Sequence, residues 1–187
     1  QAIKPEICDQ IVTDCKQNIL KEASVLSYDS KGRDDPTIRK TSIDFITDKD
    51  NKINELAWHF LREANKTQFN YELTFFQAIQ FAEYKDGGFY GWHQDANGID
   101  SSNETRKLSL TLVLSDPNTF EGGELQFYNG GRPLEDNGKI VAEQVQQDIQ
   151  SQGTVVVFGS RDWHRVTPVV DGTRHSIVCW CCGPNFK

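Results

Sequence analysis

Two segments that lie far apart in the chain, residues 84–95 and 162–180, restrict the fold more than any other feature of the sequence. The first contains His93 and Asp95 in an H-x-D pattern. Because successive side chains of a β-strand alternate between its faces, these two residues would project the same way, about 7 Å apart. The second segment contains His164 and, ten residues later, Arg174. A fold that uses all four side chains together must bring the two segments against each other.

The spacing of His164 and Arg174 tests how the second segment folds. If Asp171 and Gly172 closed a two-residue hairpin, the two side chains would point to opposite faces of one sheet and could not serve one site. Either the turn is longer or bulged, or the chain crosses from one sheet to another at this corner. In the second case both side chains point into the gap between the sheets, as in a jelly roll.

The residue types in these segments indicate a metal site. Two imidazoles and one carboxylate form the facial triad that binds non-haem Fe(II) and leaves positions open for a co-substrate and O2. The guanidinium of Arg174 would pair bidentately with a carboxylate and stay charged when buried, so it is the natural anchor for a dicarboxylate co-substrate. Each residue also has an ordinary interpretation, a structural histidine or a surface salt bridge. The four residues in this order favour the metal site.

Four stretches of sequence carry a resemblance to a known family. The chain is similar to the Fe(II)- and 2-oxoglutarate-dependent dioxygenases, and within them it resembles the prolyl-4-hydroxylase and PKHD-type branch. The resemblance covers roughly residues 76–183. The stretches are Y-K-D-G-G-F-Y-G-W-H-Q-D (84–95), R-K-L-S-L-T-L-V-L-S-D-P (106–117), E-G-G-E-L-Q-F (121–127) and H-R-V-T-P-V-V-D-G-T-R (164–174).

The resemblance implies a mainly β fold with flanking α-helices, built on a double-stranded β-helix, or jelly-roll, core with N-terminal helices. We expect a single domain over residues 1–187, which also agrees with the chain length. Within it we expect a helical and substrate-loop part at 1–70 and a jelly-roll core at about 71–183.

The resemblance also implies roles for individual residues. 2-Oxoglutarate would bind Arg174, with a hydrogen bond from Tyr84 and with Trp180 packed beside it. Collagen-type prolyl hydroxylases have lysine where Arg174 stands, so the match favours the PKHD and oxygen-sensor side of the branch. The iron ligands, which would also be the catalytic residues, are His93, Asp95 and His164.

The implied activity is hydroxylation of a C–H bond, with O2 consumed, succinate and CO2 released, and ascorbate keeping the iron reduced. The leading substrate is a prolyl residue in a peptide or protein. Tyr90 is a candidate wall of the substrate site, or else a core aromatic residue. Arg39 and Arg161 are candidate substrate contacts. With Arg33 and Lys40 they would favour an acidic or carboxylate-bearing target, although charges on loops are usually only solvated.

Three alternative functions are left open. The same chemistry could act on a free amino acid or another small molecule. A non-catalytic jelly-roll binding module would keep the fold but would not need the complete triad and Arg174. A zinc hydrolase could use the two histidines and the aspartate with a water molecule, but it gives no reason for an arginine in the pocket.

Composition argues against several other partners. The net charge of −7 and the pI of about 5.1 do not suit nucleic-acid binding, which needs a basic stripe. AlkB-type demethylases share the iron site but have a second arginine where Trp180 stands. No stretch approaches 18 apolar residues, so no membrane segment is expected. The five cysteines lack zinc-type pairing, which favours buried free thiols and a cytoplasmic location. The sequence does not predict the oligomeric state.

Hydrophobic periodicity predicts two helices. The first is expected at 5–22, and its buried face comprises Ile7, Ile11, Cys15 and Ile19. The second is expected at 48–66, with Asp48 or Asp50 as its N-cap and with His59 in solvent. Its buried face comprises Ile53, Leu56, Ala57, Phe60, Leu61 and Ala64.

Strands are expected mainly after residue 70. They cover 38–45, 73–84, 89–95, 108–114, 124–127 and 154–158, the last as a buried central strand. In 108–114 the leucines alternate with Ser109, Thr111 and Val113, so one face should join an apolar layer while the other forms a cavity wall. A long polar insert at 128–152 has room for one strand near 139–145. The segments 27–42 and 96–105 are candidate loops beside the site.

Overall fold

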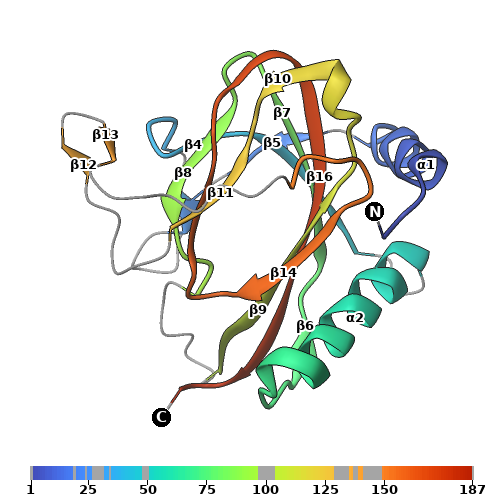
Figure 1. The fold of residues 1–187 in the computed structure, drawn as a ribbon, viewed down its shortest axis with the longest axis vertical. Coiled ribbons are helices and arrows are strands. Elements are labelled where there is room, and N and C mark those ends of the chain that lie inside the picture. Colours follow the sequence, from blue (N-terminus) through green and yellow to red (C-terminus); the bar gives the residue numbers. More distant parts are fainter. Residues whose placement is uncertain are drawn as a thin grey trace.

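The computed structural model describes residues 2–18, 20–23, 25–26, 32–33, 35–47, 51–96, 104–128, 135–136, 139–140 and 149–186. Two antiparallel sheets pack face to face, and two helices lie along the outer side of the larger sheet (Figure 1). This is the mainly β architecture with flanking helices that the sequence predicts.

The larger sheet has the strand order β1-β5-β7-β16-β9-β14, with β6 and β10 also paired to β16. Its strands are β1 (Lys21–Glu22), β5 (Ser42–Ile46), β6 (Phe75–Phe76), β7 (Ile79–Lys85), β9 (Glu104–Val113), β10 (Phe120–Gly122), β14 (Val155–Gly159) and β16 (Val169–Pro184).

The smaller sheet has the order β11-β15-β8-β4. Its strands are β4 (Arg39–Lys40), β8 (Phe89–His93), β11 (Leu125–Tyr128) and β15 (Trp163–Val166). Two further pairs are short hairpins, β2 (Val25–Leu26) with β3 (Gly32–Arg33) and β12 (Glu135–Asp136) with β13 (Lys139–Ile140). A 3₁₀ turn, η2 (Pro117–Thr119), precedes β10.

The predicted alternation along β9 is confirmed. Its leucines, with the following Leu114, are nearly or fully buried in the core cluster that contains the two helices. Ser109 and Thr111 are also buried but project from the opposite face, toward the smaller sheet. β9 therefore separates an apolar layer from a polar interior surface between the sheets.

Helix α1 (Pro5–Cys15) is shorter than predicted. Its buried face is Cys8, Ile11 and Cys15, whereas Ile7 is 49% exposed, so the predicted extent and part of the predicted face are wrong. Residues 21–22 are extended instead, because their backbone pairs with β5 as strand β1. Tertiary pairing at the sheet edge thus overrides the local helical pattern. Ile19 lies outside the described residues.

Helix α2 (Lys52–Ala64) continues as a π-helical turn, η1 (Asn65–Phe69). Its N-cap is Asn51, whose side chain accepts a hydrogen bond from the Ile53 backbone N–H at 2.9 Å. The predicted caps at 48 and 50 are therefore wrong, and those two residues lie outside the described part. His59 is exposed, as predicted.

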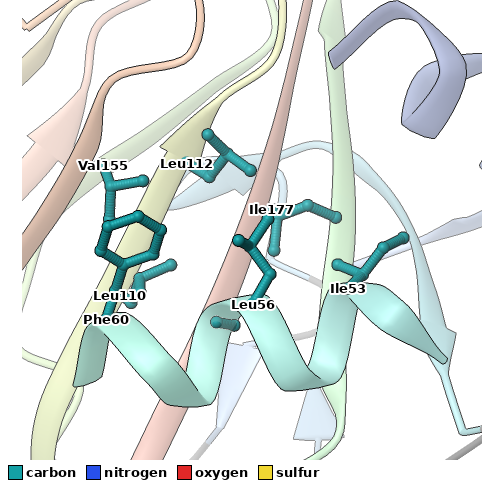
Figure 2. A pocket seen from close by; sticks show the side chains of 8 residues that line it. Ile53, Leu56, Phe60, Leu110, Leu112, Val155 and Ile177 are labelled. Carbon is teal, nitrogen blue, oxygen red and sulfur yellow. The ribbon is translucent and has the colours of Figure 1, made fainter. Parts of the chain in front are cut away.

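The apolar face of α2 meets the larger sheet. Ala57 and Leu61 are buried there. Figure 2 shows that the side chains beside them enclose a small cleft with no polar side chain in its wall. The cleft is lined by Ile53, Leu56, Ala57, Phe60, Leu110, Leu112, Val155 and Ile177.

Three strand predictions need correction. β14 is at the edge of the described sheet and is not central. Its run of valines is explained by partial burial of both faces of the strand. Val155 and Val157 pack against the helical core, and Val156 packs against the core between the sheets. The predicted strand 38–45 is two strands, β4 and β5, in different sheets, and 73–84 is broken into β6 and β7. Of the predicted strand at 139–145, only residues 139–140 are described.

Of the two alternatives drawn from the spacing of His164 and Arg174, the structure shows the crossing between sheets, but it lies before the predicted corner at Asp171 and Gly172. β15 belongs to the smaller sheet and β16 to the larger one, and the chain crosses between them at residues 167–168. Asp171 and Gly172 do not form a hairpin turn, because β16 runs through them. Gly172 has φ +73°, and a Cβ there would come within 2.2 Å of the Thr119 carbonyl oxygen, so the close approach of β10 requires glycine.

Within the described residues, no helix is long and apolar enough to cross a membrane.

Leu61 should be a strong contributor to stability, since its side chain is fully buried between α2 and the larger sheet. Leu61→Ala should lower the free energy of unfolding in urea by about 2–5 kcal/mol, because it leaves a cavity in a packed core. Ile7→Ala, at an exposed position of α1, should change it by less than about 0.5 kcal/mol. Equal losses in the two variants would contradict this packing.

Candidate metal centre

Two histidines face each other across neighbouring strands of the smaller sheet. In the antiparallel register of β8 and β15, His93 is paired with His164. Asp95 follows His93 in a turn, so β8 ends two residues earlier than predicted. The Asp95 carboxylate reaches back between the rings, with Oδ1 3.6 Å from His93 Nε2 and Oδ2 3.5 Å from His164 Nε2. The ligand atoms of these three residues all lie within 4.8 Å of one another.

The outer nitrogens of both imidazoles fix their tautomers. His93 Nδ1 lies 2.8 Å from the Gly91 carbonyl oxygen, and His164 Nδ1 lies 2.9 Å from the Asp162 carbonyl oxygen. A carbonyl can only accept, so each Nδ1 carries a proton, and in the neutral form of each ring the Nε2 lone pair then points inward. Two lone pairs and a carboxylate then converge on one point, which is favourable only with a cation between them. The donor set therefore fits a divalent metal ion.

Burial and neighbouring charges hold the two ligands of the H-x-D pattern in the protonation states that a metal needs. Burial, with the nearby His164, lowers the pKa of His93 to about 3. Burial alone would raise the pKa of Asp95, but His164, His93, Arg106 and a hydrogen bond from Ser109 together lower it to about 2. At neutral pH the carboxylate is ionised and the His93 ring is neutral.

A pair of serines holds the Asp95 carboxylate in place. Ser109 Oγ donates to Asp95 Oδ2 at 2.6 Å, and Ser160 Oγ lies 2.9 Å from Ser109 Oγ. Because the Ser109 proton is used on the carboxylate, Ser160 is the donor in the second bond. Both serines are at most 1% exposed. Ser109 comes from β9, so this contact also ties the larger sheet to the metal centre.

A β-bulge brings Tyr90 onto the same face as His93. The register pairs His93 with His164 but Tyr90 with Val166. Between these two pairs the chain advances three residues on β8 and two on β15, which is the signature of a bulge. The Tyr90 ring consequently stacks on the His93 ring, with centroids 3.5 Å apart and planes at 13°. The guanidinium of Arg39 lies 4.5 Å from the Tyr90 centroid. Burial raises the pKa of Tyr90 to about 12, so the phenol stays protonated.

Arg174 lies in the interior between the sheets, paired in register with Tyr84 of β7. It is 2% exposed, donates one hydrogen bond to Ser176 Oγ at 3.3 Å, and lies over the Tyr84 ring at 5.4 Å. Among the described residues no carboxylate forms an ion pair with it. Gly123 makes room for it, since a Cβ there would come within 2.8 Å of Arg174 Cδ.

Trp180 shares a face of β16 with Arg174, because the two positions are six residues apart on one strand. It is 6% exposed, and the guanidinium of Arg106 lies 3.8 Å from its ring centroid. Arg106 also donates to Gln77 Oε1 at 2.9 Å and approaches the Asp95 carbonyl oxygen at 3.5 Å. Arg106 thus joins Trp180 to the turn that carries Asp95.

Not every predicted site residue lies in this group. Arg161 is exposed and stacks on the Phe186 ring at 4.0 Å, although its carbonyl oxygen accepts a hydrogen bond from Gln94. Lys40 donates to the Asp86 carbonyl oxygen. The side chain of Arg33 lies outside the described residues, as do 27–31 and 97–103 of the predicted rim loops.

Sequence analysis did not single out Ser109, Ser160 or Arg106 as site residues. The alternation along β9 is the one signal that pointed toward Ser109, because it put that hydroxyl on a predicted cavity wall.

Comparison with known proteins is consistent with this geometry. A sequence model of the 2OG-Fe(II) oxygenase superfamily matches residues 79–182. A PKHD-type hydroxylase of Synechococcus sp. (strain CC9605) is 37% identical over 94 residues, which is 50% of this chain and 36% of that protein. A PKHD-type hydroxylase of Acidovorax ebreus (strain TPSY) is 30% identical over 142 residues, 72% of this chain and 57% of that protein. The chain thus matches between 36% and 57% of the length of these relatives.

Solved structures share the fold. A prolyl-4-hydroxylase of Pseudomonas putida superposes with a TM-score of 0.67 at 24% identity, covering 96% of this chain and 88% of that one. A prolyl hydroxylase of Trichoplax adhaerens, in complex with a hypoxia inducible factor oxygen degradation domain peptide fragment, gives a TM-score of 0.68 at 19% identity, covering 94% and 76%. These likenesses confirm the predicted jelly-roll class.

Ser109→Ala should weaken metal binding, because Asp95 loses the hydrogen bond that orients its carboxylate. We expect the affinity for Co(II) or Mn(II), measured by calorimetry, to fall by about tenfold or more, as for other outer partners of metal ligands. Ser109→Thr, which keeps the hydroxyl, should restore most of it. Ser115→Ala removes a buried hydroxyl elsewhere and serves as the control. Equal affinities in Ser109→Ala and Ser115→Ala would contradict the proposed role of Ser109.

Metal-free protein should lose stability as the pH falls from 6.5 toward 3. The pKa of His93 is lowered from 6.5 to about 3 on folding, so between these values only the unfolded chain binds the proton. The free energy of unfolding should therefore fall with falling pH, by at most about 1.4 kcal/mol per pH unit from this group. Urea denaturation at several pH values, with a chelator present, measures the slope of the free energy of unfolding against pH. His93→Gln should reduce it, and an unchanged slope in that variant would show that His93 is not the group.

Proposed function

The chain belongs to the 2OG-Fe(II) oxygenase superfamily, and we propose that it hydroxylates a C–H bond of a substrate bound beside His93, Asp95 and His164. As a member of this family it is an oxygenase that uses Fe(II), 2-oxoglutarate and O2. The leading substrate is a prolyl residue in a peptide or protein. The observation that carries the proposal is the convergence of two imidazoles and one carboxylate in the interior between the sheets, where Arg174 also lies with no carboxylate partner among the described residues.

The metal would be held by His93, Asp95 and His164, whose donor atoms fit a divalent ion. When bound, the iron and 2-oxoglutarate supply the oxygen chemistry that hydroxylates the substrate and releases succinate and CO2. The chain's own contribution is to hold the three ligands on one side of the metal. Ser109 fixes the carboxylate, and the backbone carbonyls of Gly91 and Asp162 fix the two rings.

Arg174 would bind the far carboxylate of 2-oxoglutarate. A buried guanidinium is costly unless an anion neutralises it, and the described residues supply none. Tyr84, its partner on β7, would donate a hydrogen bond to the co-substrate. Trp180, on the same face of β16, would form an apolar wall that keeps water from it. Ascorbate would act by keeping the iron reduced between turnovers.

A prolyl substrate is supported by two observations on related proteins. The curated relatives are named PKHD-type hydroxylases, and the structural neighbours are prolyl hydroxylases, one of them in complex with a peptide fragment. In this chain Tyr90, stacked on the ligand His93, would be the wall of the substrate site nearest the metal. The same chemistry on a free amino acid or another small molecule is the alternative.

Succinate formation tests this function. Anaerobically purified protein, supplied with Fe(II), ascorbate, 2-oxoglutarate and air, should release succinate, and a panel of proline-containing peptides should gain the mass of one oxygen atom. His93→Ala should lower the rate roughly hundredfold or more, since it removes a metal ligand. Arg174→Ala should mainly raise the KM for 2-oxoglutarate, because Arg174 is placed to bind the co-substrate and not the metal.

Arg62→Gln is the matched control for Arg174→Ala. Arg62 is an exposed arginine on α2 that stacks on the Phe76 ring, away from the interior. It should leave the rate unchanged. A folded, iron-loaded wild-type protein that releases no succinate, with or without peptides, would refute the proposed enzyme.

A further inference from the structure

Arg39 is a buried cation that the proposed metal and co-substrate do not use. Its side chain is 9% exposed, and its Nε is fully buried without a hydrogen-bond partner. No carboxylate among the described residues forms an ion pair with it. Burying a guanidinium without an acceptor costs free energy, so a guanidinium in this position is expected to have a function.

The position of Arg39 connects it to the metal centre. β4 pairs Arg39 with Tyr90 of β8. One face of the Tyr90 ring is covered by His93 at 3.5 Å, so the guanidinium, 4.5 Å from the same centroid, covers the other face. Arg39 therefore lies one aromatic ring away from a metal ligand. The stack holds the guanidinium in a defined plane while leaving its N–H groups free to donate at the edge.

The charges around Tyr90 are unbalanced. The Arg39 guanidinium lies 4.5 Å from the Tyr90 centroid, and Arg106 approaches the carbonyl oxygen of Asp95 at 3.5 Å. Asp95 is the one carboxylate of this group, and it is committed to the metal. Arg39 and Arg106 thus place two positive charges near the proposed metal ligands, in addition to Arg174 at the co-substrate position.

We propose that the substrate of this site carries a carboxylate, and that Arg39 binds it at the edge of the Tyr90 ring. The inference rests on the proposed function, since it concerns the molecule that is hydroxylated. A neutral peptide carbonyl would satisfy one N–H and leave the charge uncompensated, whereas a carboxylate accepts from two N–H groups of the planar fork and neutralises it. The carboxylate can be the α-carboxylate of a small acid or an acidic side chain next to the reacting residue.

Two pairs of probes test the proposal and separate these sources. N-acetyl-L-proline and N-acetyl-L-prolinamide differ by one carboxylate, and the blocked peptides Ala-Pro-Glu and Ala-Pro-Gln differ by one side-chain carboxylate. Binding of each to the Mn(II) and 2-oxoglutarate complex is measured by calorimetry without O2. We expect the acid of at least one pair to bind about tenfold or more tightly than its neutral partner. The pair that shows the preference identifies the source of the carboxylate.

Arginine variants assign the preference to Arg39. Arg39→Gln should abolish it, and Arg39→Lys, which keeps the charge but not the fork, should retain part of it. Arg62→Gln, which removes an arginine stacked on Phe76 far from the site, should keep it in full. If Arg39→Gln does not fold, as judged by circular dichroism, Arg39→Lys decides: it should lower the preference, and an unchanged preference counts against the proposal.

Three outcomes would overturn the proposal: acids and neutral partners that bind equally, no detectable binding of any of the four probes, or a preference that survives in Arg39→Gln. The affinity for 2-oxoglutarate is measured in the same samples. If 2-oxoglutarate binds but the acid preference is missing, this inference alone fails. If 2-oxoglutarate does not bind, the proposed function fails.

Discussion

The pairing of β8 with β15 is the contact on which the site depends. It sets His93 opposite His164 on adjacent strands, close enough that one carboxylate two residues further on reaches both rings. The bulge in β8 then turns Tyr90 to the same side, and Ser109 reaches the carboxylate from the opposite sheet. The contact from Ser109 needs the two sheets to stay face to face, so the stability of the core and the position of the Asp95 carboxylate are coupled.

Buried positive charge is the second feature that organises the interior. Arg174 and Arg39 each lie almost fully out of solvent, on different sheets, without a carboxylate partner among the described residues. Proteins rarely bury such groups except to bind an anion. A dicarboxylate at Arg174 and a second carboxylate at Arg39 would give each guanidinium its counter-ion. The two arginines would then position the co-substrate and the substrate by charge before the reaction begins.

Much of this arrangement was predictable from the sequence. The alternation of side chains on strands restricts how His164 and Arg174 can share a site, and the alternating leucines of β9 fix which face of that strand is apolar. The end of α1 was not predictable, because residues 21–22 gain backbone partners on β5 that no local pattern shows. The bulge at β8, the edge position of β14 and the contacts of Arg106 likewise depend on pairings between distant segments. The alternation along β9 indicates that Ser109 faces the interior, but no pattern in the sequence shows that it contacts Asp95 and Ser160.

The central claim is that the three ligands and Arg174 together bind Fe(II) and 2-oxoglutarate. Its most direct test is an anaerobic titration of 2-oxoglutarate into the Fe(II)-loaded protein, followed by the visible charge-transfer absorption of an iron-chelated 2-oxo acid. We predict a band that saturates at one 2-oxoglutarate per iron. Folded protein that binds iron but develops no band at saturating 2-oxoglutarate would contradict the account.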